Sequence, residues 1–93
     1  MDLFKIHDIT GRAISLSTSH WNHITSEHKE VRHPQQLIEA LQHPTLVVNS
    51  AYDSMVRWFY RHNKQHNNFL FVAVKYLNHH GYIITAYNVR RIR

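Results

Sequence analysis

The stretch FLFVAVKYLNHHGYIITAYNV, residues 69–89, decides the fold of this chain. Its two ends, Phe69–Leu77 and Tyr82–Val89, are rich in β-branched and aromatic residues, which favour strands. The segment between them reads NHHG and supplies the asparagine and glycine that are common in turns. Because so short a connection favours adjacent antiparallel strands, the stretch predicts a β-hairpin.

Two earlier runs extend the predicted sheet. Thr45–Asn49 and Val56–Arg61 have the same β-branched and aromatic composition, and the connection over residues 63–68 is again short and polar. We therefore expect four strands over residues 45–89, paired as an antiparallel meander.

The N-terminal half predicts a further hairpin and two helices. Apolar stretches on either side of Gly11 predict a β-hairpin over Phe4–Leu16. Hydroxyl side chains at residues 17–19 can cap a first helix, and Pro34 suits the first turn of a second, short amphipathic helix. The predicted fold class is α+β, with the N-terminal β-hairpin and two helices packed on a four-stranded antiparallel meander sheet.

Length and composition predict one globular domain, residues 1–93. Two domains within 93 residues would each be too small to bury a core, and 43% hydrophobic with 18% charged residues is a globular composition. The absence of cysteine excludes disulfides, thiolate metal sites and a cysteine nucleophile. The sequence shows no leader-like start and no apolar run of membrane-spanning length, so we expect a cytoplasmic protein with no membrane partner.

The charge balance leaves two interpretations open. The chain has 11 Lys and Arg against 6 Asp and Glu, a formal net charge of +5, and 10 histidines add positive charge in mild acid. An anionic partner such as RNA suits this balance. A modest positive charge also keeps a small domain soluble, so charge alone does not decide between the two.

Histidines on the first predicted helix are candidates for acid–base chemistry. Glu27 follows His23 by one helical turn, so its carboxylate can hydrogen-bond the imidazole, although such pairs are also ordinary surface contacts. His28 falls on the neighbouring arc beside Trp21 and Ile24. It is therefore either a reactive side chain or a core imidazole bonded to a backbone carbonyl.

Side chains on the last two predicted strands add further polar groups. Lys75 is the only cation in its strand, which suits either an active site or a strand end that reaches water. Strict alternation places Thr85 and Tyr87 on the same face as Ile83, so that two hydroxyl groups lie side by side.

These residue types fit metal-free cleavage of RNA by its own 2′-hydroxyl group. The reaction needs a base, an acid for the leaving oxygen and donors for the phosphate charge. No histidine spacing matches a zinc motif, so we expect neither a metal nor another cofactor. The side chains expected to hold RNA, by phosphate contacts or base stacking, are Arg57 and Arg61, which flank Phe59, together with Tyr60, Trp58, Arg90 and Arg91.

A family resemblance is carried by short motifs along the chain. In order they are GRAISL at residues 11–16, WNHI at 21–24 with His28 and Glu30, LQHP at 41–44, FY at 59–60, VAVK at 72–75 and ITAY at 84–87. Over nearly its whole length the chain resembles the phage-type branch of the barnase, EndoU, colicin and RelE-like nuclease fold. The W-x-H-I-x3-H helix and the I-T-A-Y strand are the most specific motifs.

The resemblance implies a metal-independent endoribonuclease of the toxin or effector type, restrained by a separate antitoxin or inhibitor protein. Its implied active-site residues are His23, His28, Lys75, Thr85 and Tyr87. Lys29 departs from the family, which usually has proline there. Two alternatives stay open: a noncatalytic RNA- or protein-binding module on the same fold, and a structural homo-oligomer built through an exposed strand edge or helix face.

Overall fold

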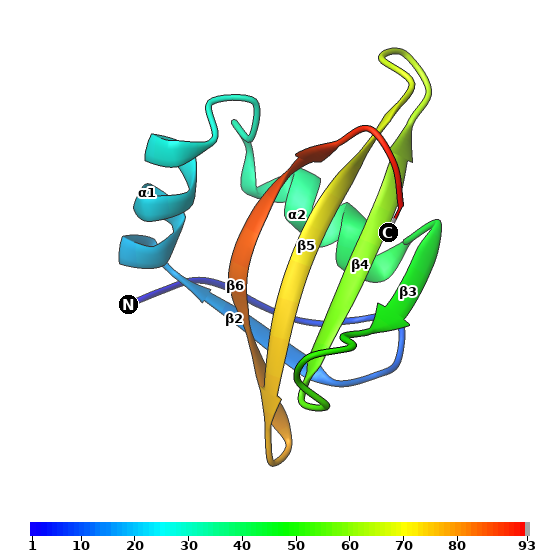
Figure 1. The fold of residues 1–93 in the computed structure, drawn as a ribbon. Helices are drawn as coiled ribbons and strands as arrows, with labels where there is room; N and C mark the ends of the chain where they lie inside the picture. The colour runs from blue at the N-terminus through cyan, green and yellow to red at the C-terminus, as the bar shows by residue number, and fades with distance from the viewer. Residues whose placement is uncertain (93) are drawn as a thin grey trace.

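The computed structural model describes residues 1–92, which form an α+β domain (Figure 1). The elements in chain order are β1 (Asp2–His7), β2 (Ala13–Ser17), α1 (Thr18–Glu27), α2 (Pro34–Gln42), β3 (Leu46–Asn49), β4 (Val56–Asn63), β5 (Asn68–Leu77) and β6 (His80–Val89). Within residues 1–92, neither helix has the length and apolar character needed to cross a lipid bilayer. Arg93, the end of the predicted basic tail, lies outside the described residues.

All strands of the described chain belong to one mixed sheet, with the order β1-β2-β6-β5-β4-β3. The hairpin β1–β2 joins this sheet because β2 runs parallel to β6, with Ala13 opposite His80 and Ser15 opposite Tyr82. The prediction of a separate hairpin on a four-stranded antiparallel sheet was therefore wrong. A parallel pair needs a long crossover, here residues 18–79. Turn residues predict pairing only between strands that follow each other in sequence, so they could not reveal this pair.

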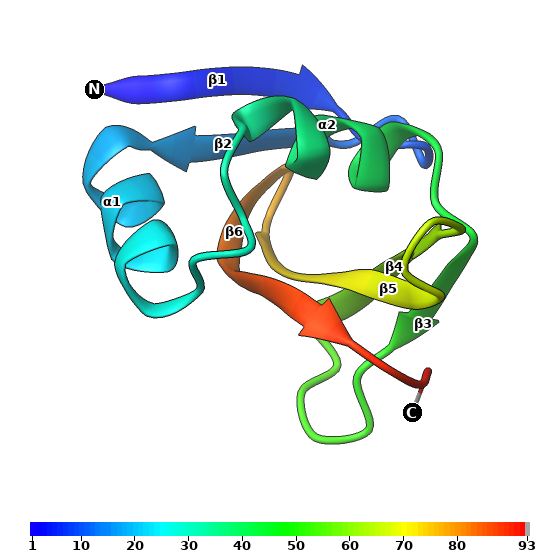
Figure 2. The same cartoon turned by 90° about the horizontal axis from the view of Figure 1, so that it is seen from above.

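The two helices form where local signals place them, and each has a distinct position. The Ser17 side chain caps α1 by accepting a hydrogen bond from the His20 N–H, and Pro34 occupies the first turn of α2. In Figure 1, α2 lies behind β4 and β5, while α1 stands beside the upper half of β6. Figure 2 shows from above how the curved sheet wraps around α2. One sheet face is thus covered by a helix, and we call the other the open face.

Apolar side chains occupy both faces of the sheet. The main core, between the sheet and the helices, contains Ile14, Leu16, Ile24, Leu37, Leu41, Phe59, Val72, Val74 and Ile83, all nearly inaccessible to solvent. A second cluster on the open face is built from Tyr60, Phe71 and Ala73, with partly buried Trp58, Phe69, Ile84, Tyr87 and Val89 around it. No helix of the described chain covers this aromatic surface.

A β-bulge in β6 determines which side chains reach the open face. Thr85 lies opposite Ala73, but Ile83 lies opposite Val74, so Ile84 is an extra residue in β6. Ile83 is fully buried in the main core, whereas Tyr87 belongs to the cluster on the open face. The expectation that Thr85 and Tyr87 share a face with Ile83 was therefore wrong, because strict alternation fails across a bulge.

Candidate active site on the open face of the sheet

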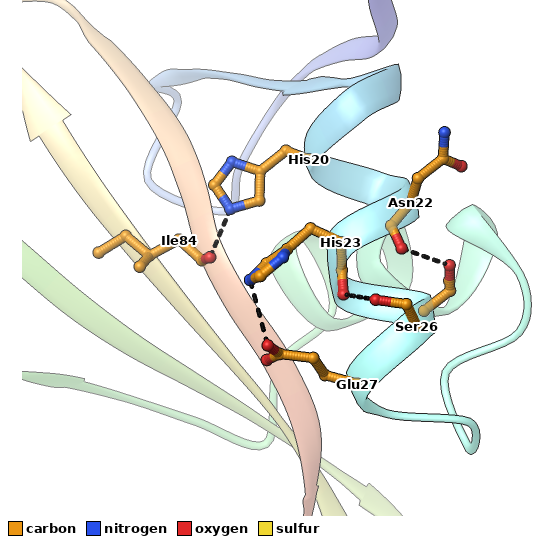
Figure 3. A network of polar contacts seen from close by, with 7 residues as sticks. His20, Asn22, His23, Ser26, Glu27 and Ile84 are labelled. Atoms are coloured by element: carbon orange, nitrogen blue, oxygen red, sulfur yellow. Dashed lines mark hydrogen bonds and ion pairs between the residues drawn. The ribbon is translucent and has the colours of Figure 1, made fainter.

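In the second half of β6, side chains form hydrogen bonds with the edge backbone groups that another strand would otherwise pair with. Beyond Tyr82, β6 has no pairing with β2. The His20 ring Nε2 donates to the Ile84 carbonyl at 2.6 Å (Figure 3), and the Glu30 carboxylate accepts from the Asn88 N–H at 3.1 Å. Both contacts hold α1 and the following loop against β6 and satisfy backbone groups that would otherwise need water.

His23 and Glu27 form the predicted pair, but on the solvent side of α1. The His23 Nε2 lies 3.6 Å from Glu27 Oε1, and the two side chains are 63% and 57% exposed. The nearest aromatic neighbour of the His23 ring is His20, with centroids 6.2 Å apart. Figure 3 shows this contact between the His23 ring and Glu27, separate from the bond between the His20 ring and the Ile84 carbonyl.

His28 and Tyr87 are brought into direct contact. His28 ends α1, where its N–H donates to the Ile24 carbonyl at 2.9 Å. Its ring stacks on the Tyr87 ring, with centroids 5.0 Å apart and planes inclined by 29°. Both side chains are only partly buried, so the imidazole is placed where a ligand on the open face can reach it.

A carboxylate beside His28 adds to the electrostatics of this end of the site. Burial alone would raise the pKa of Glu30, but hydrogen bonds from the N–H groups of Asn88 and Glu30 and the nearby positive charge of His28 together lower it. Glu30 is thus held as an anion close to the imidazole of His28.

Tyr87 also lines an aromatic pocket on the open face, with a volume of about 550 Å³. Its wall continues from Tyr87 to Phe71, whose ring centroid is 5.0 Å away, and from Phe71 to Trp58 at 5.9 Å. The last aromatic ring of the wall is that of Tyr52, which is 91% exposed and whose centroid lies 6.5 Å from that of Trp58. Arg91 stands at the rim. The pocket thus combines aromatic faces with one cation.

Tyr60 is buried beneath this surface and not displayed on it. It is 2% exposed and packs against Phe71 with ring centroids 5.3 Å apart. Tyr60 therefore forms part of the pocket floor. Trp58, on the same strand face, is only half-buried and has more surface to offer a ligand.

Lys75 lies at the opposite end of the open face from Tyr87. Phe71 is opposite Tyr87 and Lys75 is opposite Tyr82, so Lys75 lies four positions along β5 from the residue that faces Tyr87, about 13 Å of strand. The Lys75 ammonium group is 3.2 Å from a carboxylate oxygen of Asp53. The predicted catalytic residues are therefore not gathered at one point: Thr85 lies between the two ends.

Arg57 and Arg61 are on the other side of β4. Arg61 donates to the His43 carbonyl at 2.6 Å and lies 3.8 Å from Glu39 of α2. The Arg57 guanidinium carbon is 5.1 Å from the centre of the Tyr76 ring, in the layer that faces the helices. Of the predicted RNA-binding arginines, Arg91 lines the open-face pocket, and Arg90 is exposed just after β6.

Sequence reasoning missed two contributors to this region. Tyr52 is an exposed aromatic residue in the loop before β4, and its position in a polar loop was the signal that could have identified it. His20 is the second, because its bond to the Ile84 carbonyl forms where β6 extends beyond its pairing with β2, and no local pattern specifies where that pairing ends. Within residues 1–92, no three His, Asp or Glu side chains meet closely enough to hold a metal ion.

Comparisons with known proteins do not assign the chain to a family. No protein-family model matches it, and neither a curated protein nor a solved structure matches it.

Proposed function

We propose that this domain binds single-stranded RNA on the open face of its sheet and cleaves it without a metal ion. The observation that carries the proposal is the stacked pair of His28 and Tyr87 beside the aromatic pocket. One group suited to proton transfer and one surface suited to unpaired bases meet there. The resemblance of the W-x-H-I-x3-H and I-T-A-Y motifs to nuclease motifs supports the same chemistry.

The pocket supplies recognition. Unpaired bases stack on aromatic side chains whatever their sequence, at about 1–3 kcal/mol per base. Trp58 and Tyr52 offer such faces, and Arg91 at the rim can hold a phosphate. Paired bases in a helix would not reach these rings, so we expect single strands to be preferred.

The chemistry follows from the position of His28. The 2′-oxygen forms a bond to the adjacent phosphorus as the bond from phosphorus to the 5′-oxygen breaks, leaving a 2′,3′-cyclic phosphate and a 5′-hydroxyl. In this proposal His28 removes the proton from the 2′-hydroxyl and a proton returns to the 5′-oxygen from the imidazolium. The hydroxyl groups of Tyr87 and Thr85 donate to the phosphate oxygens.

A noncatalytic RNA-binding module is the second candidate, and the position of Lys75 favours it. That ammonium group is paired with Asp53 at the far end of the strand from His28, where it cannot neutralise a phosphate held beside His28. In either version a protein inhibitor that covers the open face is the partner expected for a toxin or effector.

Two matched substitutions test the proposal. His28→Asn removes the proton-transfer group from the site, and His66→Asn makes the same change in an exposed turn. Purified proteins are incubated with a fluorescent single-stranded RNA in EDTA, and both binding and cleavage are measured. We expect His28→Asn to lose cleavage and keep binding, while His66→Asn retains both. Binding without cleavage by the unchanged protein would select the noncatalytic candidate, and absence of binding would reject both.

A further inference from the structure

A second basic site lies on the helix-facing side of the sheet, away from the open face. Arg12 follows the β1–β2 turn, and its guanidinium carbon lies 4.9 Å from the centre of the Tyr76 ring. The guanidinium carbon of Arg57 lies 5.1 Å from the same centre. The two arginines and the tyrosine line a cavity of about 250 Å³, whose other polar walls are Asn49, Ser54 and Asn78.

The tyrosine that both guanidinium groups contact is held rigidly. Tyr76 is 4% exposed, and its hydroxyl donates to Asp8 Oδ2 at 2.5 Å. Gly81 lies opposite Tyr76 on β6, and a Cβ added there would come within 3.0 Å of the Tyr76 ring and 2.6 Å of Ile14. The ring therefore uses the space left by the missing side chain and forms a fixed platform for the guanidinium groups.

Asp8 does not neutralise the arginines by direct pairing. Its other oxygen, Oδ1, accepts from the Thr10 N–H at 2.9 Å, the Thr10 hydroxyl at 2.6 Å and the Arg12 N–H at 3.1 Å. All these donors are backbone or hydroxyl groups. The carboxylate thus fixes the turn and the tyrosine, while two guanidinium charges share one buried anion.

The guanidinium donors of this site remain largely unused. Within residues 1–92 neither Arg12 nor Arg57 has an ion pair, and Arg57 makes one long hydrogen bond to the Thr10 hydroxyl at 3.4 Å. Arg61, on the same strand, instead has a carbonyl and a carboxylate as partners. Two neighbouring cations with free planar donors are the arrangement that binds phosphate oxygens.

We propose that Arg12 and Arg57 bind a phosphate group in this cavity, with Tyr76 as the platform that aligns them. The polar side chains of Asn49 and Ser54 lie where they can complete the contacts. The ligand is an internal phosphate of a bound RNA strand or the terminal phosphate of a nucleotide or RNA end. The site does not depend on cleavage at the open face, since Asn49 is the one lining residue that the two pockets share, and neither His28 nor Tyr87 lines this cavity.

The first test is a titration of the unchanged protein with inorganic phosphate, followed by NMR of the arginine Nε–H groups. We expect saturable shifts at Arg12 and Arg57, and weaker binding by about tenfold or more in Arg12→Gln and Arg57→Gln. Arg32→Gln removes the same charge from an exposed position elsewhere and should leave phosphate affinity unchanged. Arg57→Lys keeps the charge without the planar fork and should also weaken binding.

Two results would overturn the proposal: no saturable shift, or an equal loss of affinity in Arg32→Gln, which would mean nonspecific attraction. Thermal melting of each variant confirms that it is folded. Short RNAs with a 5′-phosphate or a 5′-hydroxyl then separate the two sources. Preference for the phosphorylated RNA identifies a terminal phosphate, and equal affinity that depends on Arg12 identifies an internal one. Since neither binding assay requires cleavage, the phosphate site can fail while the nuclease proposal stands.

Discussion

Replacing Tyr76 with phenylalanine removes one hydroxyl group from a buried contact between two side chains. In the folded protein this hydroxyl donates to Asp8 Oδ2 at 2.5 Å, and Asp8 is 4% exposed. Without it, one carboxylate oxygen stays buried without its donor, while Oδ1 keeps its three hydrogen bonds. The ring of Tyr76 and its contacts with Gly81 are unchanged by the substitution.

The expected loss follows from the charge on the acceptor. A hydrogen bond to a charged group contributes about 1.5–3 kcal/mol to stability. In a domain of this size each kcal/mol moves the melting temperature by about 4–8 °C, so we expect Tyr76→Phe to melt about 10 °C lower at neutral pH.

The pH dependence of this loss identifies its cause. Burial alone would raise the pKa of Asp8, but hydrogen bonds from Thr10, Tyr76 and Arg12 outweigh it and hold the pKa below its usual value. Because the folded pKa of Asp8 is lowered, its ionised form adds stability above the unfolded pKa, and that stability is lost as the pH falls through the folded value. The difference between Tyr76→Phe and the unchanged protein should therefore be complete at neutral pH and shrink below about pH 4.

Urea unfolding at neutral pH and at about pH 3 measures both free energies of unfolding. Tyr82→Phe is the matched control, because Tyr82 lies on the neighbouring strand and, within residues 1–92, its hydroxyl has no hydrogen-bond partner. It should change stability little at either pH. A loss below about 0.5 kcal/mol in Tyr76→Phe at neutral pH would refute the reasoning, since it is smaller than an ordinary buried hydrogen bond. A loss that stays the same in acid would refute the assignment to the ionised carboxylate.

Three further predictions concern packing and RNA contact. Gly81→Ala should destabilise the fold by about 1–3 kcal/mol, because the new Cβ would lie 2.6 Å from Ile14 Cδ1; thermal melting measures this. Trp58→Ala should weaken binding of single-stranded RNA by about 1–3 kcal/mol, measured by fluorescence anisotropy, with unchanged affinity arguing against base stacking. Asp53→Asn should free the Lys75 ammonium group, so RNA affinity should rise at low salt and fall more steeply as salt is added.

Local signals were sufficient for most elements but not for their assembly. The short connections between β3, β4, β5 and β6 made their antiparallel neighbours predictable. The parallel pairing of β2 with β6 was not, because it joins residues far apart in sequence, such as Ser15 and His80, whose side chains are 2.7 Å apart. No pattern within either strand specifies that partner.

The candidate site was likewise predictable only in part from the sequence. The sequence predicted His28 and Tyr87 in one site, and in the structure their rings are stacked. It also grouped Lys75 with them, but the sheet register places Lys75 at the other end of β5, beside Asp53. The bulge at Ile84 could not be predicted, because an extra residue in β6 leaves the composition of the strand unchanged. Which face a side chain occupies thus depended on tertiary structure.

The chemistry of the RNA ends after incubation with the protein tests the central claim most directly. Two single-stranded substrates are compared in EDTA, one all-ribose and one with 2′-deoxyribose at every position. The account predicts that both bind on the open face, and that only the ribose strand is cut, leaving 2′,3′-cyclic phosphate and 5′-hydroxyl ends. An intact ribose strand at saturating protein, or cleavage of the deoxyribose strand, would contradict it.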